Sequence, residues 1–131
     1  MPQEIRHIDP DELLEANKDY LDRIEREGVN LVYDATLDTL FIEFGGPKAA
    51  LSEHIVDNIM LRIEPETLQI VGCEILDFFS DFVPNHRLVR DMISDLELQE
   101  GKDSTVTLME PQYKALRDMI GAAIPHLAQA I

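Results

Sequence analysis

The chain has 131 residues, of which 45% are hydrophobic, and its 26 Asp and Glu residues against 11 Lys and Arg residues give a formal net charge of −15. This length and apolar content are those of a single folded domain, residues 1–131, and exclude a disordered tail. The negative charge argues against a nucleic-acid-binding protein, because phosphates would be repelled and the sequence contains no basic cluster.

The sequence shows no pattern that directs a chain to a membrane or out of the cell. No apolar run approaches the roughly 20 residues needed to cross a bilayer, and residues 1–7 lack the basic and apolar parts of a secretory signal. The single cysteine, Cys73, cannot form an intramolecular disulfide. We therefore expect a cytoplasmic protein that does not bind membranes.

The first predicted element is an N-terminal helix within residues 1–28. Asp9 suits its N-cap and Pro10 its first position. Apolar residues then recur at helical spacing as far as Ile24, and Gly28 is placed to end the helix. The apolar stripe predicts that this helix lies on a sheet.

From residue 29 the apolar period changes to two, which is typical of β-strands. Strands are predicted over residues 30–33, 39–44, 50–55, 59–63 and 68–76. Because the turns between them are short, neighbouring strands must pair antiparallel. Residues 29–76 are thus predicted to form an antiparallel β-meander of four or five strands, in which Gly72 marks a bulge or a close approach.

Residues 77–131 are predicted to form a C-terminal helical region with two or three helices. Residues 77–84 read as an aromatic-rich connection, and Asn85 suits the N-cap of the helix that follows. Residues 105–109 fit a strand or a helix, and Pro111 suits the start of a further helix. The predicted fold class is therefore α+β.

One stretch resembles a known family. Its residues are Tyr33-Asp34 with Asp38, the strand Leu40-Phe41-Ile42, and the ending Gly72-Cys73-Glu74-Ile75-Leu76. Over residues 29–76 this pattern is similar to a family of small bacterial β-meander domains of unknown function. The resemblance implies no established activity; because genes of this type often neighbour small toxin-like genes, it implies an antitoxin-like or partner-binding role. The chain departs from the family pattern in residues 1–28 and after Phe82.

The sequence carries no catalytic motif, and we predict no catalytic residue, metal or cofactor. Tyr33, Asp34 and Asp38 surround the first hairpin turn, where aspartate ordinarily bonds backbone amides. A cation site there would need more oxygen ligands than this segment offers. Cys73 has apolar neighbours and is predicted to be a buried strand residue, not a nucleophile.

The leading functional prediction is a non-catalytic protein-interaction or oligomerisation module. Its predicted binding patch is aromatic and apolar and is rimmed by carboxylates; it comprises Phe41, Met60, Phe78, Phe79 and Phe82. A symmetric homodimer would cover the partly apolar second face of the sheet. A basic protein is the other expected partner, because its charge would complement the acidic surface.

The alternative prediction is a small enzyme or a ligand- or metal-binding protein. Its candidate residues, expected beside the sheet edge, are Glu74, Asp77, Asp81 and His86. These side chains would have to converge on one pocket. The period-two pattern instead predicts that Glu74 points to solvent while its strand neighbours point inward. Mimicry of a nucleic-acid backbone is a third reading of the acidity.

Overall fold

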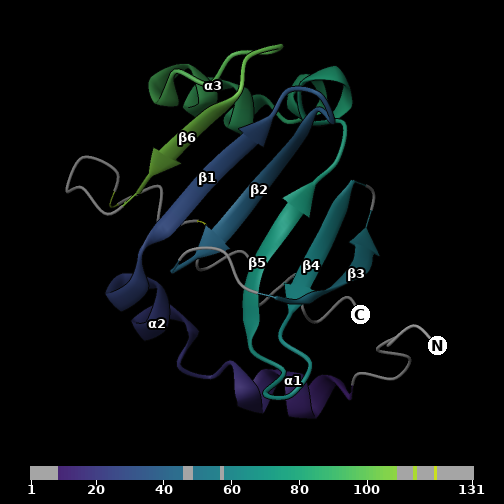
Figure 1. Ribbon diagram of the computed structural model, residues 1–131, viewed down its shortest axis with the longest axis vertical. Coiled ribbons are helices and arrows are strands. Elements are labelled where there is room, and N and C mark those ends of the chain that lie inside the picture. Colours follow the sequence, from purple (N-terminus) through teal and green to yellow (C-terminus); the bar gives the residue numbers. More distant parts are fainter. Residues whose placement is uncertain (1–8, 46–48, 57, 109–113, 115–119, 121–131) are drawn as a thin grey trace.

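Two short helices precede the sheet in the computed structural model, which describes residues 9–45, 49–56, 58–108, 114 and 120 (Figure 1). Helix α1 spans Pro10–Ala16 and helix α2 spans Tyr20–Glu27. Asp9 caps α1 as predicted, because its Oδ1 accepts the Asp11 N–H at 2.9 Å. The prediction of a single helix in this region is wrong, because the helix is interrupted after Ala16.

The break between the helices is held by the buried side chain of Asn17. Its Nδ2 donates to the backbone oxygens of Leu13, at 2.8 Å, and Leu68, at 2.9 Å. Its Oδ1 accepts the Ile70 N–H at 2.8 Å and Nη2 of Arg23 at 3.0 Å. Both donors and both acceptor positions of this amide are used. The break between the helices is therefore fixed to residues 68–70.

The sheet has six strands, all paired antiparallel, in the order β3-β4-β5-β2-β1-β6 (Figure 1). The strands are β1 Val29–Asp34, β2 Thr39–Phe44, β3 Leu51–Val56, β4 Ile59–Ile63, β5 Ile70–Ile75 and β6 Ser104–Thr107. The predicted α+β class and antiparallel sheet are confirmed. Residues 29–76 contain five strands, within the predicted four or five, and β6 adds a sixth in the segment where the sequence allowed a strand or a helix.

The order of the strands departs from a simple meander. β2 and β3 follow each other in the chain, but β5 pairs with β2, and β3 lies at the far edge. Nearly every residue of β5 is buried, which suits a central position, whereas β3 carries Ser52, Glu53 and His54. The sheet therefore consists of the β1–β2 hairpin and the β3–β4–β5 meander, joined along β2 and β5.

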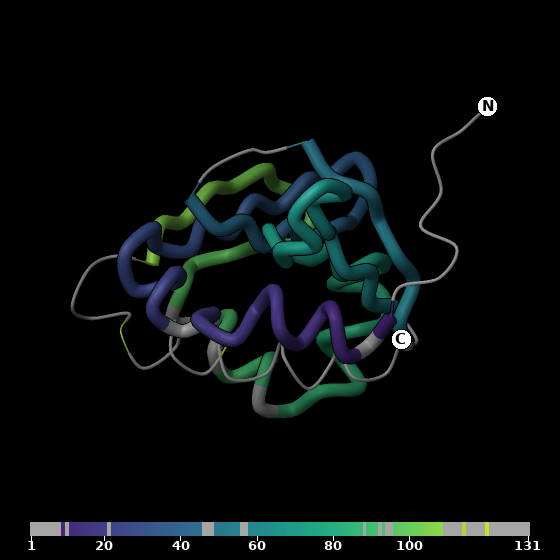
Figure 2. The backbone as a smooth tube through the Cα atoms, turned by 90° about the horizontal axis from the view of Figure 1, so that it is seen from below, coloured from purple at the N-terminus to yellow at the C-terminus, as the bar shows by residue number. Residues whose placement is uncertain are grey.

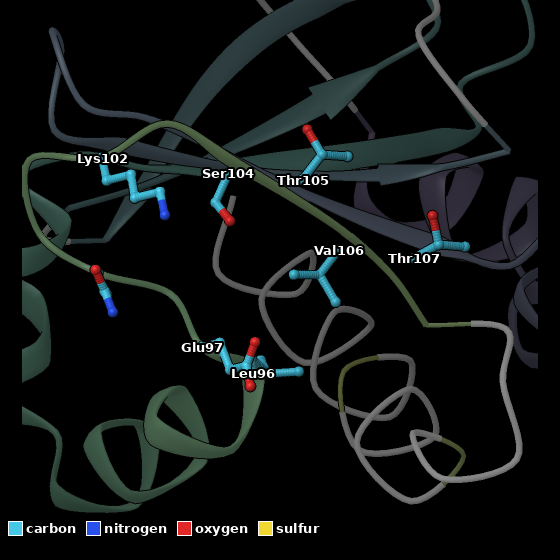
Figure 3. Close-up of a pocket in the computed structure, with 8 residues that line it drawn as sticks. Leu96, Glu97, Lys102, Ser104, Thr105, Val106 and Thr107 are labelled. Carbon is cyan, nitrogen blue, oxygen red and sulfur yellow. The ribbon is translucent and has the colours of Figure 1, made fainter.

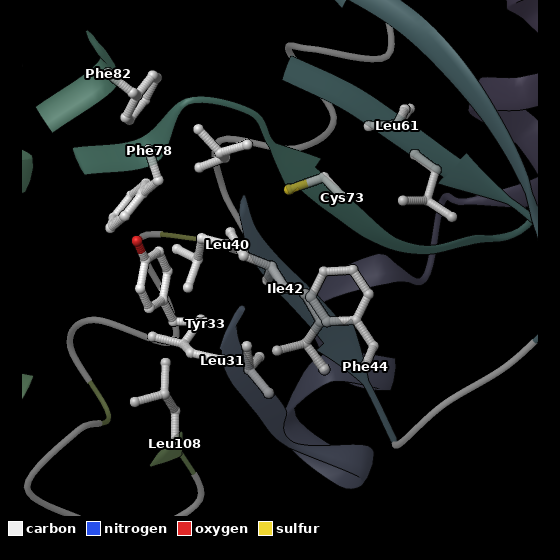
Figure 4. Close-up of a cluster of buried hydrophobic side chains, with 14 of the residues drawn as sticks. Leu31, Tyr33, Leu40, Ile42, Phe44, Leu61, Cys73, Phe78, Phe82 and Leu108 are labelled. Carbon is white, nitrogen blue, oxygen red and sulfur yellow. The ribbon is translucent and has the colours of Figure 1, made fainter. Parts of the chain in front are cut away.

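One face of the sheet carries the core. Alternate residues of the central strands point to this face, among them Leu31 and Tyr33 of β1, Ile42 of β2 and Cys73 of β5 (Figure 4). The described helices lie on this same side of the sheet (Figure 2). They contribute buried residues such as Leu13. No helix in the described part of the chain is long and apolar enough to cross a membrane.

After β5 the chain makes a π-helical turn, Phe78–Phe82, and a 3₁₀ turn, Val83–Asn85, before helix α3, Arg87–Leu96. The prediction that Asn85 caps this helix is wrong. Its Nδ2 donates instead to the Asp81 backbone oxygen at 2.8 Å, which closes the preceding turn. α3 is the one C-terminal helix among the described elements, and most of the helix predicted from Pro111 lies outside the described residues.

Gly72 lies where the two halves of the sheet approach each other closely. A Cβ on this residue would lie 2.2 Å from the backbone oxygen of Ile42 on β2. β5 also carries one extra residue here, because Arg62 pairs with Gly72 while Ile63 pairs with Ile70. Gly72 thus marks both a bulge and a close approach, as predicted.

We expect Gly72→Ala to cost about 3 kcal/mol of unfolding free energy or more, because the added methyl group meets backbone that cannot move aside. Urea unfolding monitored by circular dichroism measures this. Gly101→Ala is the matched control: its φ is 81°, with nothing within 4 Å of the added Cβ, so the cost should be about 1 kcal/mol from backbone strain alone. Equal losses in both variants would contradict the close approach.

Candidate functional site

The first hairpin turn is tied to the turn after β5 by the carboxylate of Asp38. This carboxylate accepts the Tyr33 hydroxyl at 2.6 Å and the backbone N–H groups of Phe79, at 3.0 Å, and Ser80, at 3.1 Å. The Asp38 backbone oxygen also accepts the Phe78 N–H at 2.8 Å. Asp34 makes only the local turn bond that was predicted, from the Leu37 N–H at 3.2 Å.

The electrostatics of this Asp38 network favour the ionised carboxylate. Burial raises the pKa of Asp38, but the hydrogen bonds from Tyr33, Phe79 and Ser80 outweigh it and hold the pKa below its usual value. Burial and the neighbouring carboxylate raise the pKa of Tyr33 well above its usual value. The hydroxyl therefore stays a donor and the carboxylate an acceptor, which is a structural arrangement and not an acid–base pair poised for proton transfer.

The aromatic residues that follow form a continuous stack. The Phe79 ring meets Tyr33 edge-on at 4.9 Å between centroids and Phe78 at 5.0 Å. Phe82 stacks on Phe78 at 6.0 Å and on His86 at 4.0 Å. Phe78 and Phe82 are buried, and Phe79 is half-buried against the core. These rings hold the end of the sheet together.

The structure divides the predicted binding patch. Phe78 and Phe82 lie in the core, whereas Phe41 and Met60 lie on the opposite face of the sheet. Glu74 stands between these two on that face, because it pairs with Phe41 on one side and with Met60 on the other. The five residues therefore do not form one apolar surface.

The second face of the sheet carries a mixed row of side chains. Neighbouring strands place in this row His54, Met60, Glu74, Phe41, Val32 and Thr105. Glu74 is half-buried and forms an ion pair with Arg62, whose Nε lies 3.6 Å from Oε1 of Glu74. The described helices leave this face uncovered (Figure 2). Its polar and charged content distinguishes it from the apolar interfaces of obligate dimers.

The residues of the predicted polar site do not converge. Glu74 lies on the second face, Asp77 and Asp81 are exposed on the π-helical turn, and Nδ1 of His86 lies 2.7 Å from the Phe82 backbone oxygen. Asp81 is engaged with Asn85, whose Nδ2 lies 3.2 Å from its Oδ1. Within the described residues, no three His, Cys, Asp or Glu side chains are close enough together to hold a metal ion.

Cys73 is a buried residue of β5, as predicted. Burial and the adjacent charge of Glu74 raise the pKa of the Cys73 thiol to about 12. The thiol is therefore protonated at neutral pH and packs as an apolar group.

A groove of about 490 Å³ lies beside the edge strand β6 (Figure 3). Its lining comes from β6 and from the connection between α3 and β6, and comprises Leu96, Glu97, Gln99, Lys102, Ser104, Thr105, Val106 and Thr107. Val106 is half-buried against the core, and Leu96 is buried below it. The sequence allowed a strand or a helix over residues 105–109, but it did not predict a groove here.

The pairing of β6 with β1 leaves some of its backbone groups facing outward. Val106 pairs with Leu31, and the Leu108 N–H donates to the Val29 oxygen at 2.7 Å. Backbone groups of an antiparallel strand alternate between its two sides, so those of Thr105 and Thr107 point away from β1. Among the described residues nothing bonds them, and β6 therefore presents N–H and C=O groups at the open edge of the sheet.

The two edges of the sheet differ in how they are protected. β3, at one edge, has an irregular register between His54 and Val56 and carries Glu53. Bulges and charges of this kind discourage pairing with another chain. β6, at the other edge, has a regular register and no charged residue or proline. Of the two edge strands, β6 is the one that lacks these features.

Comparisons of the chain with models of protein families, with curated proteins and with solved structures found no match. The resemblance over residues 29–76 has no support from them, and the antitoxin-like role that it implies stays a prediction.

Replacing Asp38 tests its network. Asp38→Asn keeps a side chain that tolerates the φ of 49° but turns one acceptor into a donor facing a backbone N–H. We expect a loss of about 1–3 kcal/mol of unfolding free energy at pH 7. Because the folded-state pKa is lowered, the carboxylate stabilises the fold above its unfolded pKa, and this stabilisation is lost as the pH falls through the folded value.

The difference between wild type and Asp38→Asn should therefore shrink below about pH 4. Urea unfolding at neutral and acidic pH measures it. Asp34→Asn is the control and should cost well below about 1 kcal/mol, because the amide oxygen can still accept the Leu37 N–H. A difference that stays constant in acid would contradict the ionised network.

Proposed function

We propose that the protein is a non-catalytic protein-interaction module that binds an extended segment of a partner by strand addition to β6. The observation that carries this proposal is the row of outward backbone groups of Thr105 and Thr107. An exposed edge of this kind pairs readily with an extended chain, and the backbone hydrogen bonds supply affinity while neighbouring pockets supply specificity.

The surroundings of β6 support the same proposal. The groove of about 490 Å³ runs along the four residues of the strand, so that side chains of an added strand have a place to pack. Ser104 and Val106 are half-buried and alternate with the exposed Thr105 and Thr107. An added strand would extend this alternation, with every second side chain directed into the groove.

The fixed position of β6 favours recognition without large rearrangement. The Thr107 hydroxyl donates to Oδ1 of Asn30 at 2.9 Å, and Oδ1 of Asp103 accepts the Ala35 N–H at 2.7 Å. These bonds hold the strand and its entry against the β1–β2 hairpin. A pre-formed edge lowers the entropy lost on binding.

The alternative prediction of an enzyme or ligand-binding protein has no such support. Its candidate side chains do not converge on one pocket: Glu74, Asp77, Asp81 and His86. The partner-binding role implied by the resemblance over residues 29–76 is compatible with strand addition. A homodimer through β6 would be one form of it, with a second copy supplying the added strand.

Selection from a displayed peptide library tests strand addition. We expect the wild-type protein to enrich extended peptides rich in β-branched residues, and Thr105→Pro to bind them about tenfold more weakly or worse. The proline removes an outward N–H without removing a bond to β1. Thr105→Val keeps the N–H and serves as the control. Circular dichroism of each variant reports whether the sheet is intact.

Enriched peptides that bind Thr105→Pro as well as they bind the wild type would contradict the proposal. Thr107→Pro gives a second test of the same edge, because its N–H also points outward, and it should weaken the same peptides.

A further inference from the structure

We infer that the segment accepted by β6 is a basic extended peptide of another protein, in which a Lys or Arg stands two residues from a β-branched residue so that both share one face of the strand. This inference rests on the proposed strand addition and adds the chemistry of the partner. It follows from three features of the surface beside β6: the charge of its flanking loop, the composition of the groove, and the field of the whole chain.

The loop that leads into β6 is acidic. Glu97, Glu100 and Asp103 are all exposed within it, against the single cation Lys102. Glu97 ends helix α3 in a left-handed conformation with φ of 60°, and its side chain lines the groove (Figure 3). An added strand would therefore run past exposed carboxylates.

The charged side chains that line the groove are Glu97 and Lys102, and its apolar side chains are Leu96 and Val106. Leu96 lies next to Glu97, and Val106 faces the same space from β6 (Figure 3). Successive side chains of a strand that share a face lie about 7 Å apart. One groove-facing side chain of the partner can therefore pack on Leu96 and Val106, while the next reaches Glu97. An aliphatic residue suits the first position, and Lys or Arg, with its long stem, suits the second.

The net negative charge of the whole chain also favours a basic partner. A net charge of −15 on 131 residues attracts a basic segment over the range of the Debye length and speeds its encounter with the edge. Charges at the rim of such a site mainly change the association rate and its dependence on salt. Binding should therefore weaken as the ionic strength rises.

A second copy of the chain fits this edge less well. Two copies of equal negative charge repel each other. β6 offers only four residues, Ser104–Thr107, to a symmetric pairing. Stable interfaces bury about 1,200 Å² or more, which so short a pair of strands does not provide by itself. A basic segment from a different protein is instead attracted by this charge.

Binding of two labelled peptides to the full-length chain tests the inference. One peptide repeats Val-Val-Lys-Lys, so that valine and lysine alternate along each face of the strand, and the other has glutamate in place of lysine. We expect fluorescence anisotropy to show that the lysine peptide binds about tenfold tighter or more at about 0.05 M salt, and that this preference falls at about 0.5 M salt.

Variants test whether the acidic loop before β6 causes the preference for the lysine peptide. Glu97→Gln combined with Glu100→Gln should reduce the preference for the lysine peptide about threefold or more. Glu12→Gln combined with Glu66→Gln removes the same charge from exposed positions in α1 and between β4 and β5 and should change the preference little. Helix α1 lies at the end of the sheet opposite to α3 (Figure 1). Thr105→Pro should abolish binding of the lysine peptide.

The outcomes separate the two proposals. If both peptides bind the wild type equally and both are lost in Thr105→Pro, strand addition stands and the basic partner is overturned. If the lysine peptide binds Thr105→Pro as tightly as it binds the wild type, strand addition itself fails. If neither peptide binds and sedimentation shows a dimer that Thr105→Pro dissociates, the occupant is a second copy and the basic partner is again overturned.

Discussion

The pairing of β2 with β5 is the constraint on which the rest of the structure depends. It joins a hairpin to a three-stranded meander, and at Gly72 the two backbones come so close that even a methyl group has no space. Polar side chains fix β5 beyond both of its ends: Asn17 holds the segment where the strand begins, and Asp38 holds the turn that follows it. The bonds of Asn17 and the bonds that Asp38 accepts from Tyr33 and Phe79 are buried or half-buried, so their loss leaves groups without partners.

The same pairing decides which strands are left at the edges. With β5 and β2 in the centre, β3 ends one side of the sheet, and β1 accepts β6 on the other. β3 is protected by an irregular register and by charge, whereas β6 is regular and uncharged. An unprotected edge is a hazard for a soluble protein unless a partner uses it. This contrast, together with the acidic loop that precedes β6, links the topology of the sheet to the proposed interaction.

The sequence predicted the elements better than their arrangement. Period-two runs located β1 to β5, and Asp9 located the start of α1, because these signals depend on neighbouring residues alone. The place of β5 next to β2 depends on contacts between distant segments, which no local pattern records. The roles of Asn17 and Asp38 were missed for the same reason, since both residues are common in turns. The aromatic run after β5 was predicted to be part of a binding surface, but Phe78 and Phe82 are buried in the hydrophobic core. β6 and its groove lie in the part of the sequence with the weakest periodicity.

Amide hydrogen exchange at β6, followed residue by residue by NMR, tests the central claim most directly. In the free protein the account predicts slow exchange at Val106 and Leu108, whose N–H groups face β1, and fast exchange at Thr105 and Thr107. Addition of the lysine–valine peptide should slow Thr105 and Thr107 selectively. Slow exchange of the Thr105 and Thr107 amides in the free protein would contradict an open edge. Exchange that stays fast when the peptide is bound would contradict strand addition.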